Sequence, residues 1–216
     1  MQLYSYFRSS AAYRVRIALG LKNLHWDTVT VALGAGEQRG AEFLKLNPQG
    51  LVPALALDDA RVISQSTAIV EWLEETHPRP PLYPSAALDR AAIRALCQHI
   101  ACDIHPLNNL RVLAYLKDEC ALAQDAVDRW YAHWIQRGFS AVETALEDLA
   151  GPFSLGERPG MLEVYLAPQV YNARRFKVDL RAFPKLQALD ERCRDVDAFA
   201  AAHPRRQPDT PESLRA

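Results

Sequence analysis

Two adjacent serines, Ser9 and Ser10, are the residues whose position suggests chemistry most directly. They follow a short apolar stretch and precede a run in which Val15, Ala18 and Leu19 recur at helical spacing. We therefore expect a helix to begin here, with either serine as its N-cap. The unpaired backbone N–H groups at a helix start stabilise an anion, and a thiolate is one candidate. The same pattern also fits an ordinary strand-to-helix turn with a serine cap.

A second set of candidate residues follows further along the chain. Pro53 precedes the apolar run 54–57, and we expect it at the start of a strand because proline cannot donate a hydrogen bond within a sheet. A cis bond between Val52 and Pro53 would turn the Val52 backbone toward a ligand. Gln65 and Ser66 stand at the start of another predicted helix, which is a further potential anion site.

These residues lie in a region where strand-like and helix-like segments alternate, up to about residue 76. The order strand-helix-strand-helix-strand-strand-helix is that of a thioredoxin-like domain. The segments after the first strand are a strand at 29–33, a short helix at 42–46, and a hairpin formed by 51–57 and 61–64. A proline-rich linker, 77–84, comes next. From residue 89 the pattern is helical, so we expect an all-helical second domain with five or more helices.

The segment after His203 is polar and rich in proline. We expect this tail at the surface, either loose or packed as a flap over the site.

Composition excludes several functional classes. The 216 residues carry 25 Lys and Arg against 26 Asp and Glu. Because no basic excess is present to neutralise a phosphate backbone, we expect no nucleic-acid partner. The N-terminus lacks the pattern of a secretory signal, and no apolar run approaches the length of a membrane span. We therefore expect a cytoplasmic protein with no membrane partner.

Cysteine spacing gives no indication of a metal site. No two cysteines form a CxxC pair, and none stands at metal-ligand spacing from a histidine. His99 and Asp103 are four residues apart, but two ligands do not make a site, and we interpret them as ordinary polar residues. We expect four buried, inert thiols in helical segments: Cys97, Cys102, Cys120 and Cys193.

The motifs around the serines, Pro53 and Gln65 resemble those of the glutathione-binding domain of glutathione transferases. The serine motif is similar to that of the zeta class, whose members include maleylacetoacetate isomerase and maleylpyruvate isomerase. The resemblance extends over the whole chain, through 103–113, 168–170, 174–180 and 207–211. It implies a glutathione transferase fold, with a thioredoxin-like α/β domain over 1–80, an all-α substrate domain over 88–216, and a homodimer.

The resemblance also implies glutathione as the cofactor. Thiol–disulfide enzymes of this fold place a cysteine at the start of the first helix, where this chain has serines, so the nucleophilic sulfur must come from a bound molecule. Ser9 would hydrogen-bond the glutathione sulfur, with Ser10 able to share or replace it. The remaining implied contacts are the Val52 backbone beside Pro53 for the cysteinyl unit, Gln65 and Ser66 for the γ-glutamyl carboxylate, Gln38 and Gln49 near the glycyl end, and His105 and Asn109 from the helical domain.

Arginines suggest a substrate with two carboxylates. An arginine presents a fixed fork of donors that matches a carboxylate, and several of them would stabilise an enolate as it forms. The resemblance implies Arg8 and Arg111 for this role, with Arg174 or Arg175 beside them, and we favour Arg175 of the last two. The implied reaction is cis–trans isomerisation of maleylacetoacetate or maleylpyruvate in aromatic-acid catabolism. The glutathione thiolate would add to the cis double bond and leave again after rotation.

Two other functions remain open at this level. The same thiolate would serve a general glutathione transferase that acts on small electrophiles such as α-haloacids. A non-catalytic binding protein with the same fold is a further alternative, against which the joint presence of Ser9, Pro53, Gln65 and Ser66 argues.

One departure from the family pattern concerns a helix start in the second domain. The family usually has a Ser/Thr-x-x-Asp capping box there, whereas this chain has Gly160 followed by Glu163. Because glycine supplies no side-chain acceptor, we predict that Gly160→Ser would stabilise the fold by roughly 0.5 kcal/mol.

Overall fold

The computed structural model describes residues 1–149 and 151–215, which form two compact units. The first contains Met1–Pro81 together with Arg194–Ala216, and the second contains Leu82–Cys193. The division near residue 81 lies within the expected linker. At the other end the units differ from the expected domains, because the segment after Cys193 belongs to the first unit.

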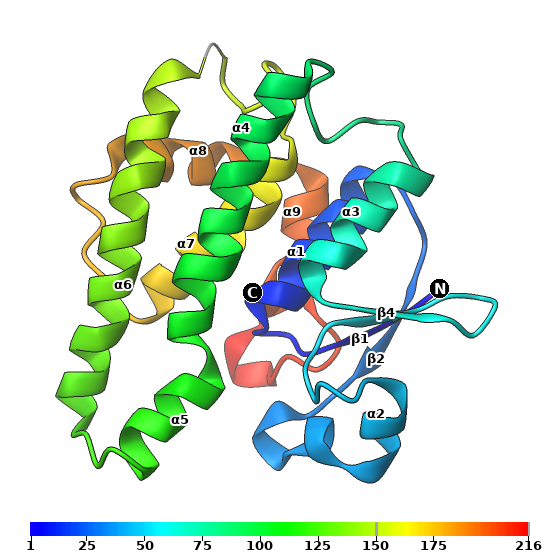
Figure 1. Cartoon of the computed structure of the whole chain (residues 1–216), viewed down its shortest axis with the longest axis vertical. Helices are drawn as coiled ribbons and strands as arrows, with labels where there is room; N and C mark the ends of the chain where they lie inside the picture. The colour runs from blue at the N-terminus through cyan, green and yellow to red at the C-terminus, as the bar shows by residue number, and fades with distance from the viewer. Residues whose placement is uncertain (150, 216) are drawn as a thin grey trace. The chain divides into compact units, whose positions relative to one another are not determined.

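The first unit is built on a four-stranded sheet with the order β2-β1-β3-β4. Strand β1 pairs in parallel with β2, while β1 with β3 and β3 with β4 are antiparallel. Figure 1 shows helices α1 and α3 on one face of this sheet and α2 on the other. The strands are β1 (Gln2–Ser5), β2 (Asp27–Thr30), β3 (Ala54–Ala56) and β4 (Val62–Ser64), and the helices are α1 (Ser10–Leu21), α2 (Ala41–Leu46) and α3 (Ser66–Thr76).

This order of elements confirms the predicted thioredoxin-like arrangement. The second strand begins two residues earlier than predicted, and it ends at Thr30 because the chain turns into a 3-10 helix at Leu33–Ala35. Apolar side chains fill both faces of the sheet. Leu3 and Leu55 are fully buried, as are Ile69 and Leu73 of α3. On the α2 side Phe43 packs in a second cluster with Val31 and Val52.

The second unit is helical, as predicted, with five α-helices among its described residues. They are α4 (Ala87–Gln98), α5 (Leu110–Asp118), α6 (Gln124–Ala145), α7 (Met161–Arg175) and α8 (Pro184–Arg194). Helix α7 is buried along nearly its whole length and forms the core of the unit. Its burial explains why α7 shows no clear amphipathic pattern in the sequence.

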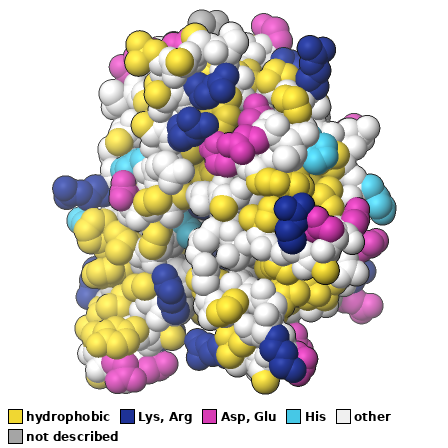
Figure 2. Space-filling model, turned by 45° about the vertical axis from the view of Figure 1, so that its right-hand side comes forward, with side chains coloured by type: hydrophobic (Ala, Val, Ile, Leu, Met, Phe, Trp, Pro, Cys, Tyr) yellow, Lys and Arg dark blue, Asp and Glu magenta, His cyan; other side chains and the backbone are white. Residues whose placement is uncertain are grey.

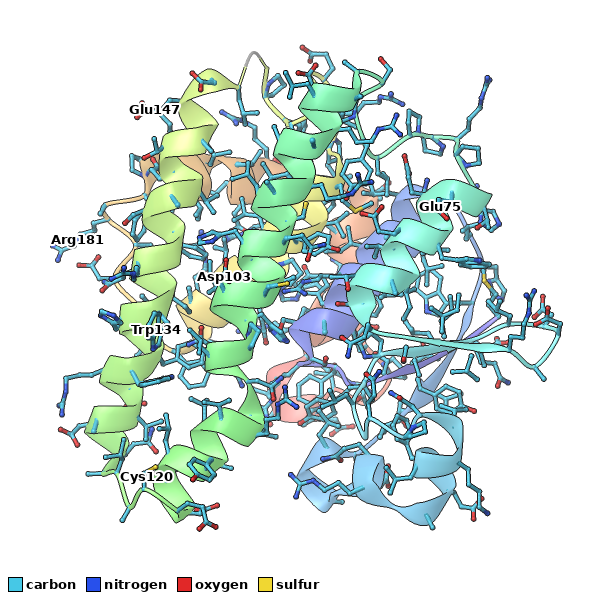
Figure 3. All side chains as sticks on the ribbon, viewed as in Figure 1. Glu75, Asp103, Cys120, Trp134, Glu147 and Arg181 are labelled. Atoms are coloured by element: carbon cyan, nitrogen blue, oxygen red, sulfur yellow. The ribbon has the colours of Figure 1, made fainter. Side chains whose placement is uncertain are left out.

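Helix α4 continues as a π-helix, His99–Ile104, before the chain turns toward α5. The widened turn is fixed by His99, whose Nδ1 lies 3.1 Å from Asp103 Oδ2 and whose Nε2 lies 3.1 Å from the Gly138 carbonyl on α6. Asp103 is labelled in Figure 3. Gly138 leaves room for this packing, since a Cβ there would lie 2.3 Å from Ile104 atoms. The two polar residues therefore stabilise the helix that leads to His105.

The start of α7 overturns the prediction made for Gly160. A Cβ at this position would lie 2.8 Å from the Leu82 carbonyl oxygen and 2.7 Å from Leu155 Cγ. Serine or threonine therefore does not fit without displacing backbone. The helix start is closed instead by Glu163, which is fully buried and accepts hydrogen bonds from the Gly160 N–H, the Ser154 N–H and the Ser154 hydroxyl, at 2.7, 2.7 and 2.6 Å.

The prediction of four buried thiols is correct for two cysteines and wrong for the other two. Cys97 and Cys193 are buried, and burial raises the pKa of the Cys193 thiol. Cys102 and Cys120 are exposed. Cys120 follows the end of α5 instead of lying within a helix, as Figure 3 shows.

The C-terminal tail is folded. It contains helix α9 (Asp197–Ala202) and two 3-10 turns, Pro204–Arg206 and Glu212–Leu214. The Gln207 side-chain amide donates to two backbone carbonyls of the same segment, each at 3.0 Å. The expected alternative of a loose tail is therefore wrong.

Surface charge is mixed, as the near-zero net charge suggests. Figure 2 shows acidic and basic side chains interspersed over the visible face. Within the part of the chain that the structure describes, no helix is both long enough and apolar enough to cross a bilayer.

Candidate glutathione and substrate site

The start of α1 resolves the choice between the two serines as N-cap. Ser9 has extended backbone geometry (φ −67°, ψ 113°), and its Oγ accepts a hydrogen bond of 3.2 Å from the Ala12 N–H. Ser10 is the first helical residue and is 5 % exposed, whereas Ser9 is only partly buried. Since the Ser9 oxygen accepts from the backbone, its hydroxyl hydrogen can be donated to a ligand at the helix start.

A tight turn presents Ser9. The Ser9 N–H donates to the Tyr6 carbonyl at 3.0 Å, which closes a turn with Phe7 and Arg8 at its centre. The guanidinium of Arg8 lies 5.0 Å from the centre of the Phe7 ring and donates to the Tyr6 hydroxyl at 3.3 Å. These two contacts hold the guanidinium of Arg8, a predicted substrate residue that directly precedes Ser9 in the chain.

The loop before β3 carries the predicted cis bond. Val52–Pro53 is cis in the structure, which confirms that expectation. Asn47 holds the loop, because its side-chain amide donates to the Leu51 carbonyl at 2.7 Å and its Oδ1 accepts from the Gln49 N–H at 3.2 Å. The Val52 backbone therefore lies in a loop whose shape is fixed by a side chain that is 2 % exposed.

Residues at the start of α3 link this loop to α1. Gln65 has a left-handed backbone (φ 70°), and its side-chain amide donates to Gln49 Oε1 at 2.5 Å. Ser66 is 5 % exposed, and its Oγ accepts a hydrogen bond of 3.4 Å from the buried Arg14 guanidinium. Because arginine carries only donors, this contact leaves the Ser66 hydroxyl hydrogen to point elsewhere.

Arg14 is a residue that the sequence reasoning missed. It lies on α1 among apolar positions and is 1 % exposed, although it carries a charge. An arginine on the apolar face of a predicted amphipathic helix was the signal that could have revealed it, since buried charges need partners.

Gln38 is the predicted residue with the most unusual environment. It is 7 % exposed, and its Oε1 has no hydrogen-bond partner among the described residues. The Gln38 backbone carbonyl lies 3.2 Å from the position that a Cβ on Gly50 would take. Gln38 therefore adjoins the loop that carries Gln49. A buried acceptor without a partner is the kind of group that a bound ligand satisfies.

The second unit holds His105 and Asn109 on the segment that follows the π-helix. Asn109 is the N-cap of α5, where its Oδ1 accepts from the Arg111 N–H at 3.1 Å. The neighbouring Asn108 is buried and donates to the Tyr131 carbonyl of α6 at 3.2 Å. The segment is therefore fixed to α6 between the two predicted residues.

The three arginines predicted in this unit have different surroundings. Arg111 is exposed at the start of α5. Arg174 forms an ion pair of 3.0 Å with the buried carboxylate of Asp190, so it stabilises the packing of α7 with α8. Arg175 is exposed, and its guanidinium lies 4.4 Å from the centre of the Phe176 ring, which in turn stacks on Tyr131.

Clusters that could bind a metal are absent from the described residues, where no three His, Cys, Asp or Glu side chains gather. Within the first unit the structure brings together Gln49 with Gln65 and Ser66 with Arg14. In the second unit His105 and Asn109 lie on one short segment before α5.

Comparisons with known proteins identify relatives of the chain. The family model for the glutathione S-transferase N-terminal domain matches residues 8–76, the range that contains every residue of the first unit that was predicted to bind glutathione. A probable maleylacetoacetate isomerase of Vibrio cholerae is 47 % identical over 96 % of this chain and 97 % of its own length.

Two solved structures extend the comparison to the fold. A bacterial maleylpyruvate isomerase, described as a glutathione S-transferase of the zeta class, has a TM-score of 0.94 at 44 % identity, covering 98 % of this chain and all of that one. The maleylacetoacetate isomerase of Anaeromyxobacter dehalogenans 2CP-1, solved with dicarboxyethyl glutathione and citrate in its active site, has a TM-score of 0.87 at 44 % identity, with 97 % of each chain covered. Similarity at this level over nearly the full length shows that the chain belongs to the zeta-class glutathione transferases, the family of the maleylacetoacetate and maleylpyruvate isomerases.

Proposed function

We propose that the protein is a glutathione-dependent isomerase that converts maleylacetoacetate or maleylpyruvate to the trans, fumaryl isomer. The observation that carries the proposal is the start of α1, where the partly exposed N-cap Ser9 accepts from the Ala12 N–H and so keeps its hydroxyl hydrogen for a ligand. Relatives with these two activities match the chain over nearly its full length.

The chain's own residues fit glutathione. Within the first unit the buried Gln38 oxygen without a partner is an acceptor for a ligand N–H, and the Ser66 hydroxyl can donate to a carboxylate. We assign the γ-glutamyl carboxylate to Gln65 and Ser66, the cysteinyl backbone to Val52, and the glycyl end to Gln38 and Gln49. His105 and Asn109 are the candidates in the second unit.

Ser9 sets the protonation state of the ligand at the start of α1. Its hydroxyl hydrogen and the N–H groups of the first helical turn stabilise negative charge there, which lowers the pKa of a thiol held beside them. Ser10 is the neighbouring alternative. Glutathione supplies the nucleophilic sulfur. Reversible addition of the sulfur converts the cis double bond to a single bond that can rotate before the sulfur leaves.

The charge of the substrate determines the role of the arginines. Maleylacetoacetate and maleylpyruvate carry two carboxylates, each of which matches a guanidinium fork. We assign Arg8 and Arg111 to these groups. Of the last pair we choose Arg175, because the ion pair of Arg174 with Asp190 already occupies that side chain. The dicarboxyethyl glutathione in the Anaeromyxobacter protein is a thioether between the glutathione sulfur and a dicarboxylate, which supports the same pairing of sulfur and dianion.

We also propose that the protein acts as a cytoplasmic homodimer. The family resemblance supports this assembly. Light scattering coupled to size-exclusion chromatography would test it, and a mass near the 24.2 kDa of a single chain would contradict it.

The decisive experiment follows the ultraviolet absorbance of each cis substrate with and without glutathione. We expect turnover that requires glutathione and is not accompanied by its consumption, because the cofactor is regenerated. Undiminished turnover by protein stripped of glutathione would overturn the proposal. Glutathione conjugation of an α-haloacid without isomerisation would favour a general transferase, and failure to bind glutathione would favour a non-catalytic protein.

A further inference from the structure

The tail motif 207–211 contacts the turn that ends at Ser9. The Phe7 N–H donates a hydrogen bond of 2.9 Å to Asp209 Oδ2, across almost the whole length of the chain. Both residues belong to the first unit. Phe7 is 4 % exposed, so this N–H cannot turn to bulk water when its partner is lost.

The carbonyl of Phe7 is also fixed by a hydrogen bond. The Phe7 carbonyl accepts a hydrogen bond of 3.1 Å from Arg16, whose guanidinium additionally donates to Ser5 Oγ and to the Ala202 carbonyl, each at 3.0 Å. Phe7 is a central residue of the turn that ends at Ser9. Asp209 fixes its N–H, and Arg16 fixes its carbonyl.

The tail is itself braced, so Asp209 is a rigid anchor. The next residue, Thr210, is 3 % exposed and donates from its hydroxyl to the Pro204 carbonyl at 2.5 Å. Arg215 donates to the Thr210 and Pro208 carbonyls on either side of Asp209, at 3.0 and 3.1 Å. The carboxylate is thus held by bonds to both of its neighbours in the chain.

We propose that Asp209 is a positioning residue for isomerisation: by holding the Phe7 N–H it fixes the turn that aims the Ser9 hydroxyl at the glutathione sulfur. The inference rests on the proposed function of Ser9. Asp209 contacts neither cofactor nor substrate and acts through the turn alone. Its effect should therefore fall on the chemical step more than on the affinity for glutathione.

The test compares Asp209→Ala with Asp209→Asn. Asparagine keeps an oxygen acceptor of the same reach and removes the charge, whereas alanine removes both. Glu212→Ala, an exposed acidic residue of the same tail, is the matched control. We expect Asp209→Ala to lower kcat roughly tenfold with KM for glutathione within about twofold, because a misplaced catalytic group chiefly affects the chemical step. Asp209→Asn and Glu212→Ala should stay close to the unchanged protein.

Two further readouts separate positioning from general stability. Hydrogen exchange at the Phe7 amide, followed by NMR on protein with isotope-labelled phenylalanine, should rise in Asp209→Ala and remain slow in Asp209→Asn. The ultraviolet absorbance of bound glutathione thiolate should fall in Asp209→Ala at saturating glutathione.

The proposal is overturned if Phe7 exchange does not change, if exchange rises while kcat stays constant, or if asparagine fails to rescue. Should the unchanged protein itself not isomerise either substrate, the proposed function fails first. That result is distinct from an active protein in which Asp209 is dispensable.

Discussion

The starts of α1 and α7 solve the same problem in opposite ways. Each helix has unpaired N–H groups at its first turn. At α1 a small, partly exposed side chain, Ser9, takes one of them and keeps a hydroxyl hydrogen for a ligand. At α7 the N-cap is Gly160 in a space too small for a side chain, and the buried carboxylate of Glu163 reaches back to the backbone. The first end is open to an anion, and the second is closed by one.

The two caps also differ in charge. Removal from water raises the pKa of Glu163, while the bonds from Ser154 and Gly160 oppose that shift. A carboxylate at α1 would occupy the place of a thiolate and repel it. The uncharged cap at α1 therefore leaves room for a thiolate at that helix start. The carboxylate of Glu163 suits the start of α7, which only packs against its neighbours.

The largest expected effect comes from removing the Ser9 hydroxyl, which caps α1. Ser9→Ala should reduce kcat by roughly a hundredfold, since one preorganised donor to a developing or fixed negative charge contributes about that factor. Steady-state kinetics with saturating glutathione measures it. Ser140→Ala, which removes an exposed serine of α6, is the control. An unchanged rate in Ser9→Ala would transfer the role to Ser10 or to the helix terminus alone.

The second effect is on stability and concerns Gly160 at the start of α7. Gly160→Ser should destabilise the protein by about 2 kcal/mol, because the added side chain overlaps the Leu82 carbonyl and Leu155. Chemical denaturation measures this, with Gly34→Ser as a control at a glycine that has open space around it. A stability equal to or above that of the unchanged protein would restore the original capping prediction.

A third helix start carries a titratable cap. His203 Nδ1 accepts from the Arg205 N–H at 3.2 Å, and its ring contacts Tyr13 edge-on. Burial, together with the nearby Arg205, Arg194, Arg206 and Arg16, lowers the pKa of His203 from 6.5 to about 4. The unfolded chain therefore binds more protons than the folded one between these values, so the contribution of His203 is complete above pH 6.5 and is lost as the pH falls toward 4.

His203→Asn should keep an acceptor for the cap and remove this pH dependence. We expect the unchanged protein to lose about 1 kcal/mol more than the variant on acidification, allowing for the partly exposed ring. Denaturant midpoints at several pH values give the difference. Parallel curves for the two proteins would contradict the assignment.

The smallest effect belongs to Asn109 on α5, whose cap is local. Asn109→Ala should destabilise the protein by about 0.5 kcal/mol through loss of the bond to the Arg111 N–H. Asn109→Ser retains a capping oxygen and should be neutral in thermal denaturation. If both variants also bind glutathione as well as the unchanged protein does, the proposed contact of Asn109 with the cofactor is wrong.

Features that depend on neighbours in the sequence could be predicted. The hydroxyl pair before an apolar helix gave the start of α1, and the apolar run after Pro53 gave β3, because capping and strand pattern act over a few residues. The failures involve partners far along the chain. Nothing near Gly160 indicates that the Leu82 carbonyl fills the space beside it. In the same way, nothing near Arg174 indicates that Asp190 pairs with it.

The candidate site shows the same contrast between local features and contacts with residues far along the chain. The roles proposed for Gln49, Val52, Gln65 and Ser66 come from the resemblance, whereas the contact of Arg14 with Ser66 required the packing of α1 beside α3. The exposed thiol of Cys102 escaped prediction because helical pattern alone does not say which face of a helix is covered, and that of Cys120 because the pattern did not place the end of α5 at Asp118.

The first unit combines an N-terminal and a C-terminal segment, so its parts are synthesised at different times. Its sheet and its serine turn are made early, but Arg16 has its Ala202 partner, and Phe7 its Asp209, only once the helical unit between them has been synthesised. A nascent chain therefore carries a serine turn without its tail partners while the helical unit is being made, and these bonds form only when the tail docks. A fusion partner or tag placed after the tail therefore lies close to the segment that completes these bonds.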